Sequence, residues 1–378
     1  MNKTEFKKLK EKISRQDKLV FDSIRQPEKN KLFEFADQYK SFLNQSKTER
    51  EAAQNIIKTA EDLGYKDIDT LARSRRKTTK KVYKTFQDRC IALAHLGRQP
   101  LSTGANIVAA HIDSPRIDLK QNPLYEDLNM GLLKTHYYGG IRKYHWLALP
   151  LALHGTLITT DLKSIDICIG ESPDDPVFTI TDLLPHLGKE QAGKKIQDVF
   201  QGEKLNLLAG SIPLGSPKEK ERIKLNILKL LHDAYGITET DFISAEIQAV
   251  PAEKARDVGF DRSMIGSYGQ DDRVCAYTSL RALMDLKPPA RTALALFFDK
   301  EEIGSEGNSG AKSSFLEDFM SDLLHISGQS TDNRSLRKAL INSSCLSADV
   351  NAAMDPDYKE VHEPLNAARI GFGICMTK

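Results

Sequence analysis

Four short segments of the sequence place a histidine or carboxylates where an apolar stretch ends or a helix opens. They are His111-Ile112-Asp113, Asp271-Asp272, Glu301-Glu302 and Asp349. Charged groups in such places are costly to bury unless they are paired or bound to a cation. All are oxygen or nitrogen donors, which suits divalent ions such as zinc, cobalt or manganese. The set predicts a metal site, and two ions about 3.5–4 Å apart would suit hydrolysis of an amide bond.

The spacing inside two of these segments favours chemistry. Positions two apart in an extended strand face the same side, which puts Asp113 beside the imidazole of His111. A carboxylate that accepts one imidazole N–H fixes the tautomer and leaves the other nitrogen for a metal. Glu301 and Glu302 directly follow an apolar run. One of them can bind a metal while the other takes a proton from the attacking water.

Each segment taken alone also has an ordinary structural explanation. A single histidine in a strand is more often a satisfied core residue than a ligand. One of Asp271 and Asp272 can be the N-cap of the following helix, and Asp349 can serve a turn. A solvated strand end with a turn at Gly304 explains Glu301 and Glu302 as well as a metal ligand with a general base does. Only the four segments together favour a metal site.

Apolar runs predict the strands that would position these residues. They cover residues 90–96, 105–112, 292–298, 339–350 and 368–376. Several are near-continuous, as in central strands covered on both faces. Helical patterns at 273–286 and 313–324 lie between the later runs. The alternation predicts an α/β fold with a mostly parallel sheet sandwiched by helices, whose carboxyl edge is the usual place of a functional site.

The middle of the chain differs from both ends. Short β-rich pieces, Gly and Pro residues and one polar helix at 216–235 predict a separate β-rich domain. We expect an α/β catalytic domain made of residues 1–120 and 247–378, and an inserted β-rich domain of residues 121–246. Within the first part, residues 3–63 predict two or three amphipathic helices that stop at Gly64.

Composition excludes several classes of protein. The 378 residues are 40% hydrophobic and 28% charged, which is globular, and the net charge of +2 creates no strong field for nucleic acid or membrane. The basic run at 73–81 is better explained as a solvated turn than as an RNA site. There is no apolar signal core or membrane-length stretch, and the five cysteines are scattered, so we expect a cytoplasmic protein with reduced thiols.

The four segments, in this order, resemble the successive motifs of the aspartyl-aminopeptidase family of two-metal aminopeptidases. The matching stretches are H-I-D-S-P-R at 111–116, D-D at 271–272, E-E-I-G-S-E at 301–306 and S-A-D at 347–349. T-D-L-L-P-H-L at 181–187 resembles its inserted domain. S-F-L through K-T-E-R-E at 41–51 resembles its N-terminal helices. The resemblance covers almost the whole chain.

The resemblance implies a role for each residue. The metal ligands would be His111, Asp271, Glu302 and Asp349. Asp271 would bridge two divalent ions, zinc first and cobalt or manganese as alternatives. Asp113 would orient His111, Glu301 would be the general base, and His186 would face the substrate of a neighbouring subunit. The family's inserted domain mediates dimerisation, and its dimers assemble into a dodecamer, so a homo-oligomer is implied.

The implied activity is metal-dependent hydrolysis of the N-terminal peptide bond of peptides. The family name suggests acidic N-terminal residues, and neutral ones remain open because no specificity pocket can be identified from the sequence. Two alternatives remain. One is a non-catalytic peptide-binding or assembly protein of the same fold, and the other is a related two-metal carboxypeptidase or deacylase.

The sequence departs from the family pattern at its C-terminal end. Family members continue for about another 80–100 residues, within the size range of a small domain. That tail includes a last histidine ligand. Here the chain ends at Lys378 inside a predicted strand, and His362 lies in a loop-like stretch. Two interpretations stay open: a truncated chain, or a shortened relative with an altered metal site.

Overall fold

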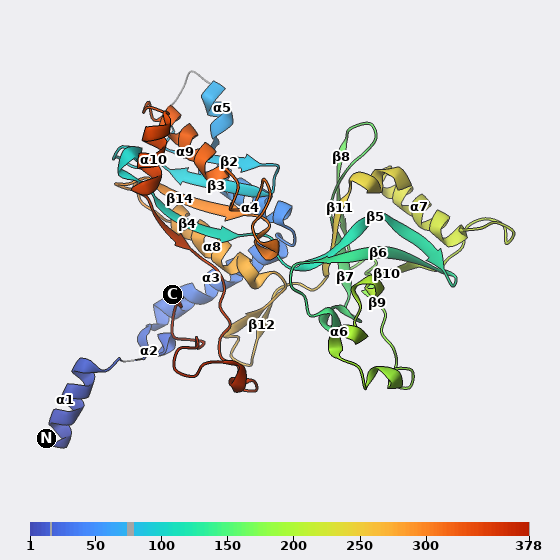
Figure 1. Cartoon of the computed structure of the whole chain (residues 1–378), viewed down its shortest axis with the longest axis horizontal. Coiled ribbons are helices and arrows are strands. Elements are labelled where there is room, and N and C mark those ends of the chain that lie inside the picture. Colours follow the sequence, from blue (N-terminus) through green and yellow to red (C-terminus); the bar gives the residue numbers. More distant parts are fainter. Residues whose placement is uncertain (16, 74–78, 378) are drawn as a thin grey trace. The chain divides into compact units, whose positions relative to one another are not determined.

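The computed structural model describes residues 1–15, 17–73 and 79–377 (Figure 1). The chain forms two compact units, residues 40–348 and residues 1–39 with 349–378. Most of the basic run at 73–81 lies outside the described residues. In the described part of the chain, none of the helices combines the length and the apolar character needed to cross a bilayer.

A six-stranded sheet carries the residues of the predicted site. Its strand order is β1-β2-β3-β14-β4-β15, and the strands are β1 (Lys66–Asp67), β2 (Lys81–Phe86), β3 (Cys90–His95), β4 (Asn106–His111), β14 (Ala293–Phe298) and β15 (Ser344–Ser347). Three neighbouring pairs are parallel, β1–β2, β14–β4 and β4–β15, whereas β3 runs antiparallel to both β2 and β14. Every residue of β3 and β14 is buried. The predicted α/β fold with a mostly parallel sheet is confirmed.

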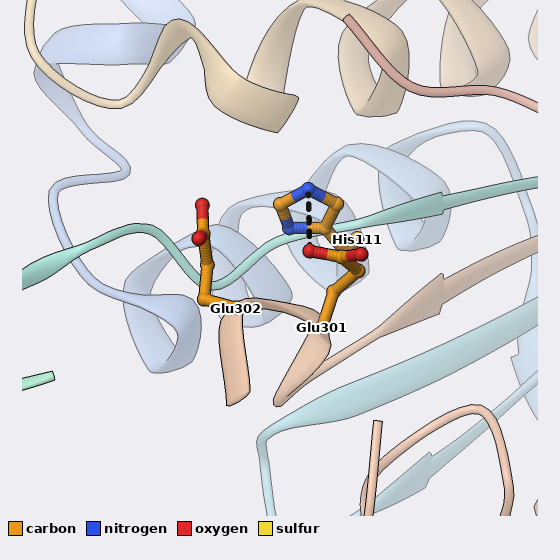
Figure 2. A group of neighbouring side chains, drawn as sticks. All are labelled: His111, Glu301 and Glu302. Carbon is orange, nitrogen blue, oxygen red and sulfur yellow. Dashed lines mark ion pairs between the residues drawn. The ribbon is translucent and has the colours of Figure 1, made fainter. Parts of the chain in front are cut away.

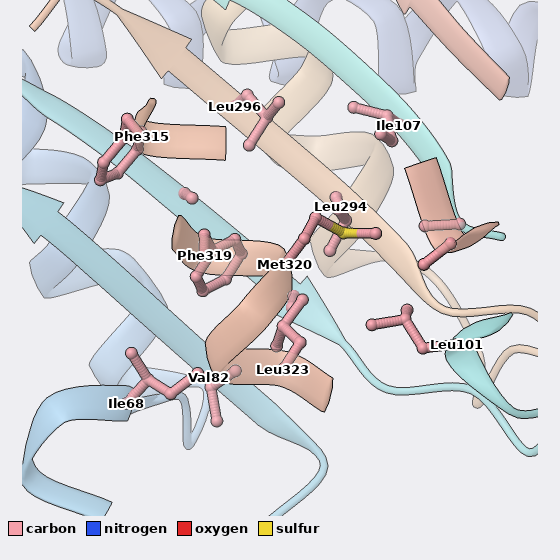
Figure 3. Packing of buried hydrophobic residues seen from close by; sticks show 14 of the residues in the cluster. Ile68, Val82, Leu101, Ile107, Leu294, Leu296, Phe315, Phe319, Met320 and Leu323 are labelled. Atoms are coloured by element: carbon pink, nitrogen blue, oxygen red, sulfur yellow. The ribbon is translucent and has the colours of Figure 1, made fainter. Parts of the chain in front are cut away.

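Helices cover both faces of this sheet. They are α4 (Glu49–Asp62), α5 (Ile68–Arg73), α8 (Gln270–Met284), α9 (Phe315–Ile326) and α10 (Asn333–Ile341). On one face, Leu294 and Leu296 of β14 pack with Phe319 and Met320 of α9 in a continuous apolar core (Figure 3). The alternate residues of β14 are equally buried, and α8 contacts this strand and β4 from the other side (Figure 1). Two-sided burial explains why these strands are continuous apolar runs.

A second sheet, of seven strands, is antiparallel throughout. Its order is β8-β7-β11-β5-β6-β10-β9. The strands are β5 (Arg116–Asp127), β6 (Met130–Tyr138), β7 (Leu151–Ile158), β8 (Ser164–Ile169), β9 (Thr179–Ile180), β10 (Leu207–Gly210) and β11 (Glu246–Pro251). Two helices, α6 (Ile196–Val199) and α7 (Arg222–Tyr235), occur between these strands in the sequence. It has its own apolar core under α7. A small hairpin, β12 (Arg256–Val258) and β13 (Met264–Gly266), follows. Both sheets lie in one compact unit, so the domain boundaries at 120/121 and 246/247 stay a prediction.

Two strand predictions near the C-terminus are wrong. The apolar run at 339–350 covers the end of α10 and the short strand β15. The prediction failed because a short apolar run fits a helix end as well as a strand. Residues 368–376 form no strand, apart from a single bridge at Ala368. Gly371 and Gly373 have φ of 83° and 95°, which interrupts an extended chain.

The N-terminal segment is helical as predicted, but it forms four helices where two or three were expected: α1 (Lys3–Ile13), α2 (Val20–Ser23), α3 (Gln26–Asn44) and α4. A capping box starts α4: the hydroxyl of Thr48 accepts the N–H of Glu51, and the Glu51 carboxylate accepts the N–H of Thr48. Gly64 follows this helix with φ of 84°, as predicted for a helix stop.

His154 of β7 is buried between two carboxylates. Its Nδ1 lies 2.7 Å from Glu51 Oε1, and its Nε2 lies 3.2 Å from Glu171 Oε1. The Nζ of buried Lys47 lies 3.7 Å from the same Glu171 oxygen. Burial opposes a charged imidazole, but the contacts with Glu171 and Glu51 outweigh it and raise the pKa of His154 to about 9. The charged imidazole therefore stabilises the contact between α4 and the seven-stranded sheet.

We expect His154→Gln to lower the free energy of unfolding more at low pH than at high pH. Because the folded-state pKa lies above the ordinary value of 6.5, the stabilisation is complete below pH 6.5 and is lost as the pH rises through 9. Its full size is at most about 3 kcal/mol. Urea unfolding at about pH 6, 7.5 and 9.5 measures it, with exposed His136→Gln as the control. A difference that does not shrink with rising pH would contradict this prediction.

Candidate metal centre

The parallel pairing of β4 with β14 brings the two main motifs to the same edge of the sheet. Phe298, the last residue of β14, is in register with His111, the last residue of β4. The chain then turns through Lys300, which has a left-handed φ of 66°, into a short 3-10 helix at Glu301–Ile303. This turn places Glu301 and Glu302 beside His111, and one donor atom of each residue lies within 4.8 Å of the others (Figure 2).

The imidazole of His111 has partners at both nitrogens. Its Nε2 lies 3.1 Å from Asp271 Oδ1 and 3.8 Å from Glu301 Oε2 (Figure 2 marks the second contact). Its Nδ1 lies 3.0 Å from the backbone carbonyl of Asp113 and 3.2 Å from Asp113 Oδ1. The contacts of Nδ1 with Asp113 therefore fix the ring, and Nε2 faces the carboxylates of Asp271 and Glu301.

Asp271 is held in place through its backbone. The Ser114 hydroxyl donates to the Asp271 carbonyl at 2.6 Å, and Arg273 Nη1 donates to that hydroxyl at 2.8 Å. Arg273 is buried and its Nη2 donates to the carbonyl of Lys47. The Asp271 and Asp272 backbones are non-helical within α8, and the peptide bond between them is cis. The Asp271 side chain is half exposed and directed at His111.

Comparison with known proteins identifies the family. The sequence model of the family described as Aminopeptidase I zinc metalloprotease (M18) matches residues 42–378. This chain belongs to the M18 family of aminopeptidases. The probable M18 family aminopeptidase 1 of Clostridium acetobutylicum is 48% identical over 363 residues, which are 96% of this chain and 78% of that relative. The namesake from Thermotoga maritima is 48% identical over 350 residues, covering 93% and 76%.

Solved structures agree with the sequence relatives. The crystal structure of the M18 aminopeptidase from Thermotoga maritima matches with a TM-score of 0.90 and 46% identity, covering 95% of this chain and 78% of that chain. Aminopeptidase I from Clostridium acetobutylicum matches with a TM-score of 0.86 and 44% identity, covering 96% and 78%. The predicted family and enzyme class are confirmed: this M18 chain is a metal-dependent aminopeptidase, a zinc metallopeptidase.

The electrostatics of this M18 site fit a divalent cation. Burial opposes charge on His111, but the hydrogen bonds that the imidazole donates to Asp113 and Asp271 outweigh it and raise the pKa of the imidazole to about 11. Burial, followed by the charge of Asp271, raises the pKa of the Glu302 carboxyl to about 7. Both shifts mean that the clustered carboxylates favour added positive charge. A divalent ion supplies it and competes for the same nitrogen and oxygen atoms.

The remaining predicted residues stand as follows. Asp272, which follows Asp271, is fully buried. Asp349 is the first residue of the C-terminal segment of the smaller unit, and it follows Ala348, whose N–H donates to the Ala109 carbonyl of β4. Its role as a ligand stays a prediction. His186 is exposed in the loop after β9, and its role toward substrate also stays a prediction.

The sequence interpretation missed the residues that support the site. Ser114 and Arg273 are each adjacent to a predicted motif residue, but only the fold shows that they meet. Tyr138 and Gly139 at the end of β6 also reach the site. A Cβ placed on Gly139, which has φ of 73°, would lie 3.1 Å from the Glu302 Cβ. The Gly139-Gly140 pair was the one sequence signal of this close approach.

Proposed function

We propose that this edge of the six-stranded sheet holds two divalent ions and hydrolyses the N-terminal peptide bond of peptides. The observation that carries the proposal is the convergence of His111, Glu301 and Glu302, with Asp271 3.1 Å from the imidazole. The proposed ligands are His111, Asp271, Glu302 and Asp349. Their oxygen and nitrogen donors suit zinc, and cobalt or manganese fit the same set.

Glu301 and Glu302 have different tasks in the proposed reaction: Glu301 is the general base and Glu302 is a metal ligand. Ions bound at this site would polarise the scissile carbonyl and lower the pKa of a water molecule. The exposed carboxylate of Glu301 takes a proton from the water that attacks the carbonyl carbon, and passes it to the nitrogen that leaves when the C–N bond breaks. The more buried Glu302 is better placed to hold an ion than to meet substrate. Asp113, with no exposed surface, positions His111.

The finer proposals concern substrate, assembly and location. We favour acidic N-terminal residues, on the family resemblance of the motifs, with neutral residues as the alternative. We also favour a homo-oligomer. The solved mApe1 dodecamer of S. cerevisiae shares the fold, with a TM-score of 0.69 at 19% identity, and sedimentation of this chain tests the assembly. The five cysteines are free, which agrees with a cytoplasmic location.

A small peptide panel tests the activity. It contains peptides with acidic or aliphatic N-terminal residues, their N-acetylated forms, and a chelator control with zinc or cobalt added back. We expect chelator-sensitive release of the first residue from free peptides and none from acetylated ones. Release from the C-terminus or of the acetyl group would instead favour a carboxypeptidase or deacylase. Peptide binding without turnover would favour a non-catalytic role.

A further inference from the structure

Tyr138 connects the seven-stranded sheet to the metal centre. It is the last residue of β6, and its hydroxyl donates to Asp113 Oδ2 at 2.7 Å. Burial and the nearby Asp113 charge raise the pKa of the phenol well above its usual range, so the hydroxyl stays protonated and remains a donor. Tyr138 and Asp113 are 25 positions apart in the sequence, and Asp113 lies in the segment that connects β4 of the six-stranded sheet to β5 of the seven-stranded sheet.

The carboxylate of Asp113 holds more than His111. Its Oδ1 accepts the backbone N–H of Glu301 at 3.1 Å and lies 3.2 Å from His111 Nδ1. Its Oδ2 accepts the backbone N–H of Glu302 at 3.2 Å and the hydroxyl of Tyr138. A carboxylate offers about four lone-pair sites, so these four contacts use its full capacity. One buried side chain thus fixes both the imidazole and the turn that carries the two glutamates.

The ring of Tyr138 is itself held firmly. The guanidinium carbon of Arg116, its partner in the β5–β6 register, lies 3.7 Å from the ring centroid. Arg116 is buried, and its Nε donates to Asp118 at 2.9 Å. A stacked, paired guanidinium restricts the ring to one orientation. The hydroxyl therefore meets Asp113 without a further loss of side-chain freedom.

We propose that Tyr138 is a positioning residue for the aminopeptidase reaction, acting through Asp113 on His111 and on the turn that carries Glu301 and Glu302. The inference rests on the proposed metal site for its effect on zinc. Without the hydroxyl, Asp113 Oδ2 keeps only the N–H of Glu302, and the carboxylate is held by three contacts instead of four. Asp113 then fixes the imidazole of His111 and the turn that carries the two glutamates less firmly.

The test is Tyr138→Phe, which removes one oxygen and keeps the ring. Partners of this kind are worth about 10- to 100-fold in metal affinity or activity. We expect the zinc dissociation constant, measured by competition with a chromophoric chelator, to rise at least about 10-fold. We also expect kcat to fall by a similar factor with a smaller change in KM. Tyr137→Phe is the matched control, because its ring is exposed on the same strand and contacts Lys143.

A double-mutant cycle separates positioning from simple packing. If Tyr138 acts through Asp113, then Tyr138→Phe changes zinc affinity by less than about twofold in an Asp113→Asn background. An equal loss in both backgrounds would make Tyr138 an ordinary structural tyrosine. So would a single variant with wild-type zinc affinity and kcat.

Hydrogen exchange of the metal-free protein gives a second measurement that needs no zinc. The amides of Glu301 and Glu302 are held by Asp113, so we expect them to exchange faster in Tyr138→Phe than in wild type or Tyr137→Phe. Unchanged exchange would overturn the proposal. If the wild-type chain binds no zinc, the metal site fails, while the exchange rates still decide the role of Tyr138.

Discussion

Replacing Glu301 by Gln is expected to lower turnover by at least about 100-fold, the usual scale of a lost general base, and to leave the metal content at the wild-type level. Gln keeps the size and shape of the side chain but cannot take a proton from water. Glu301 is also the more exposed of the two glutamates, so its loss removes little that is buried. Release of free amino acid measures the first quantity, and elemental analysis of the dialysed protein measures the second.

Variants of the proposed ligands are the contrast to Glu301→Gln. Asp271→Asn and Glu302→Gln each remove a carboxylate that faces His111, so they should release metal as well as activity. Near-normal turnover in Glu301→Gln would remove this residue from the base role. Metal loss in Glu301→Gln, with retention in Glu302→Gln, would exchange the two assignments, because one oxygen of each residue lies within 4.8 Å of the His111 donor.

The central part of the site could be predicted because local pattern and fold agree there. His111 ends the mostly apolar strand β4, Glu301 comes shortly after the apolar strand β14, and parallel neighbours end at the same edge of a sheet. The pairing of His111 with Asp113 follows from the two-residue period of an extended chain. These inferences need only the identity of the strands, which a continuous apolar run provides.

The supporting residues could not be predicted, because they depend on contacts between segments that are far apart in the sequence. Nothing in the spacing around Tyr138 indicates that its hydroxyl meets Asp113, since Asp113 lies 25 positions earlier, in the segment between β4 and β5. The second task of Asp113, accepting the N–H groups of Glu301 and Glu302, depends on the left-handed turn at Lys300. Near residue 340, the helix end and the strand have the same apolar composition, so periodicity cannot separate them.

A buried carboxylate at the start of α4 also escaped sequence interpretation. Glu49 is 1% exposed, and its Oε2 accepts a hydrogen bond from Gln248 of β11 at 2.7 Å. Arg89 and Arg116 approach its two oxygens, each at 3.6 Å. Burial opposes the charge, but the two guanidinium groups outweigh it and lower the pKa of Glu49 to about 2. One charge thus connects α4 with both sheets.

The same network reaches the turn of the metal centre. Arg89 also lies 3.2 Å from Asp299 Oδ2, and Ser309 donates to this oxygen at 2.9 Å. Asp299 directly precedes Lys300 and accepts its N–H at 2.8 Å. A second carboxylate, Glu246, pairs with Arg89 from β11. The strand end that precedes the turn with Glu301 and Glu302 is therefore fixed by a charge network centred on Arg89.

Glu49→Gln is expected to lower the free energy of unfolding at pH 7 by about 3 kcal/mol or more, the scale of a buried ion pair that loses one partner. The substitution keeps the volume and removes one carboxylate partner from both Arg89 and Arg116. Since the folded-state pKa lies below the ordinary 4.5, the stabilisation is present above pH 4.5 and is lost as the pH falls toward 2. Urea unfolding at pH 7 and at about pH 3.5 measures both effects.

Asp62→Asn is the matched control, because Asp62 is an exposed acid at the other end of the same helix. Its loss should change the free energy of unfolding by less than about 0.5 kcal/mol. A Glu49→Gln variant within about 1 kcal/mol of wild type at pH 7 would show that Asp118, Asp299 and Glu246 compensate the two guanidinium groups without Glu49. In that case the charge at position 49 contributes to the start of α4 and not to the junction of the two sheets.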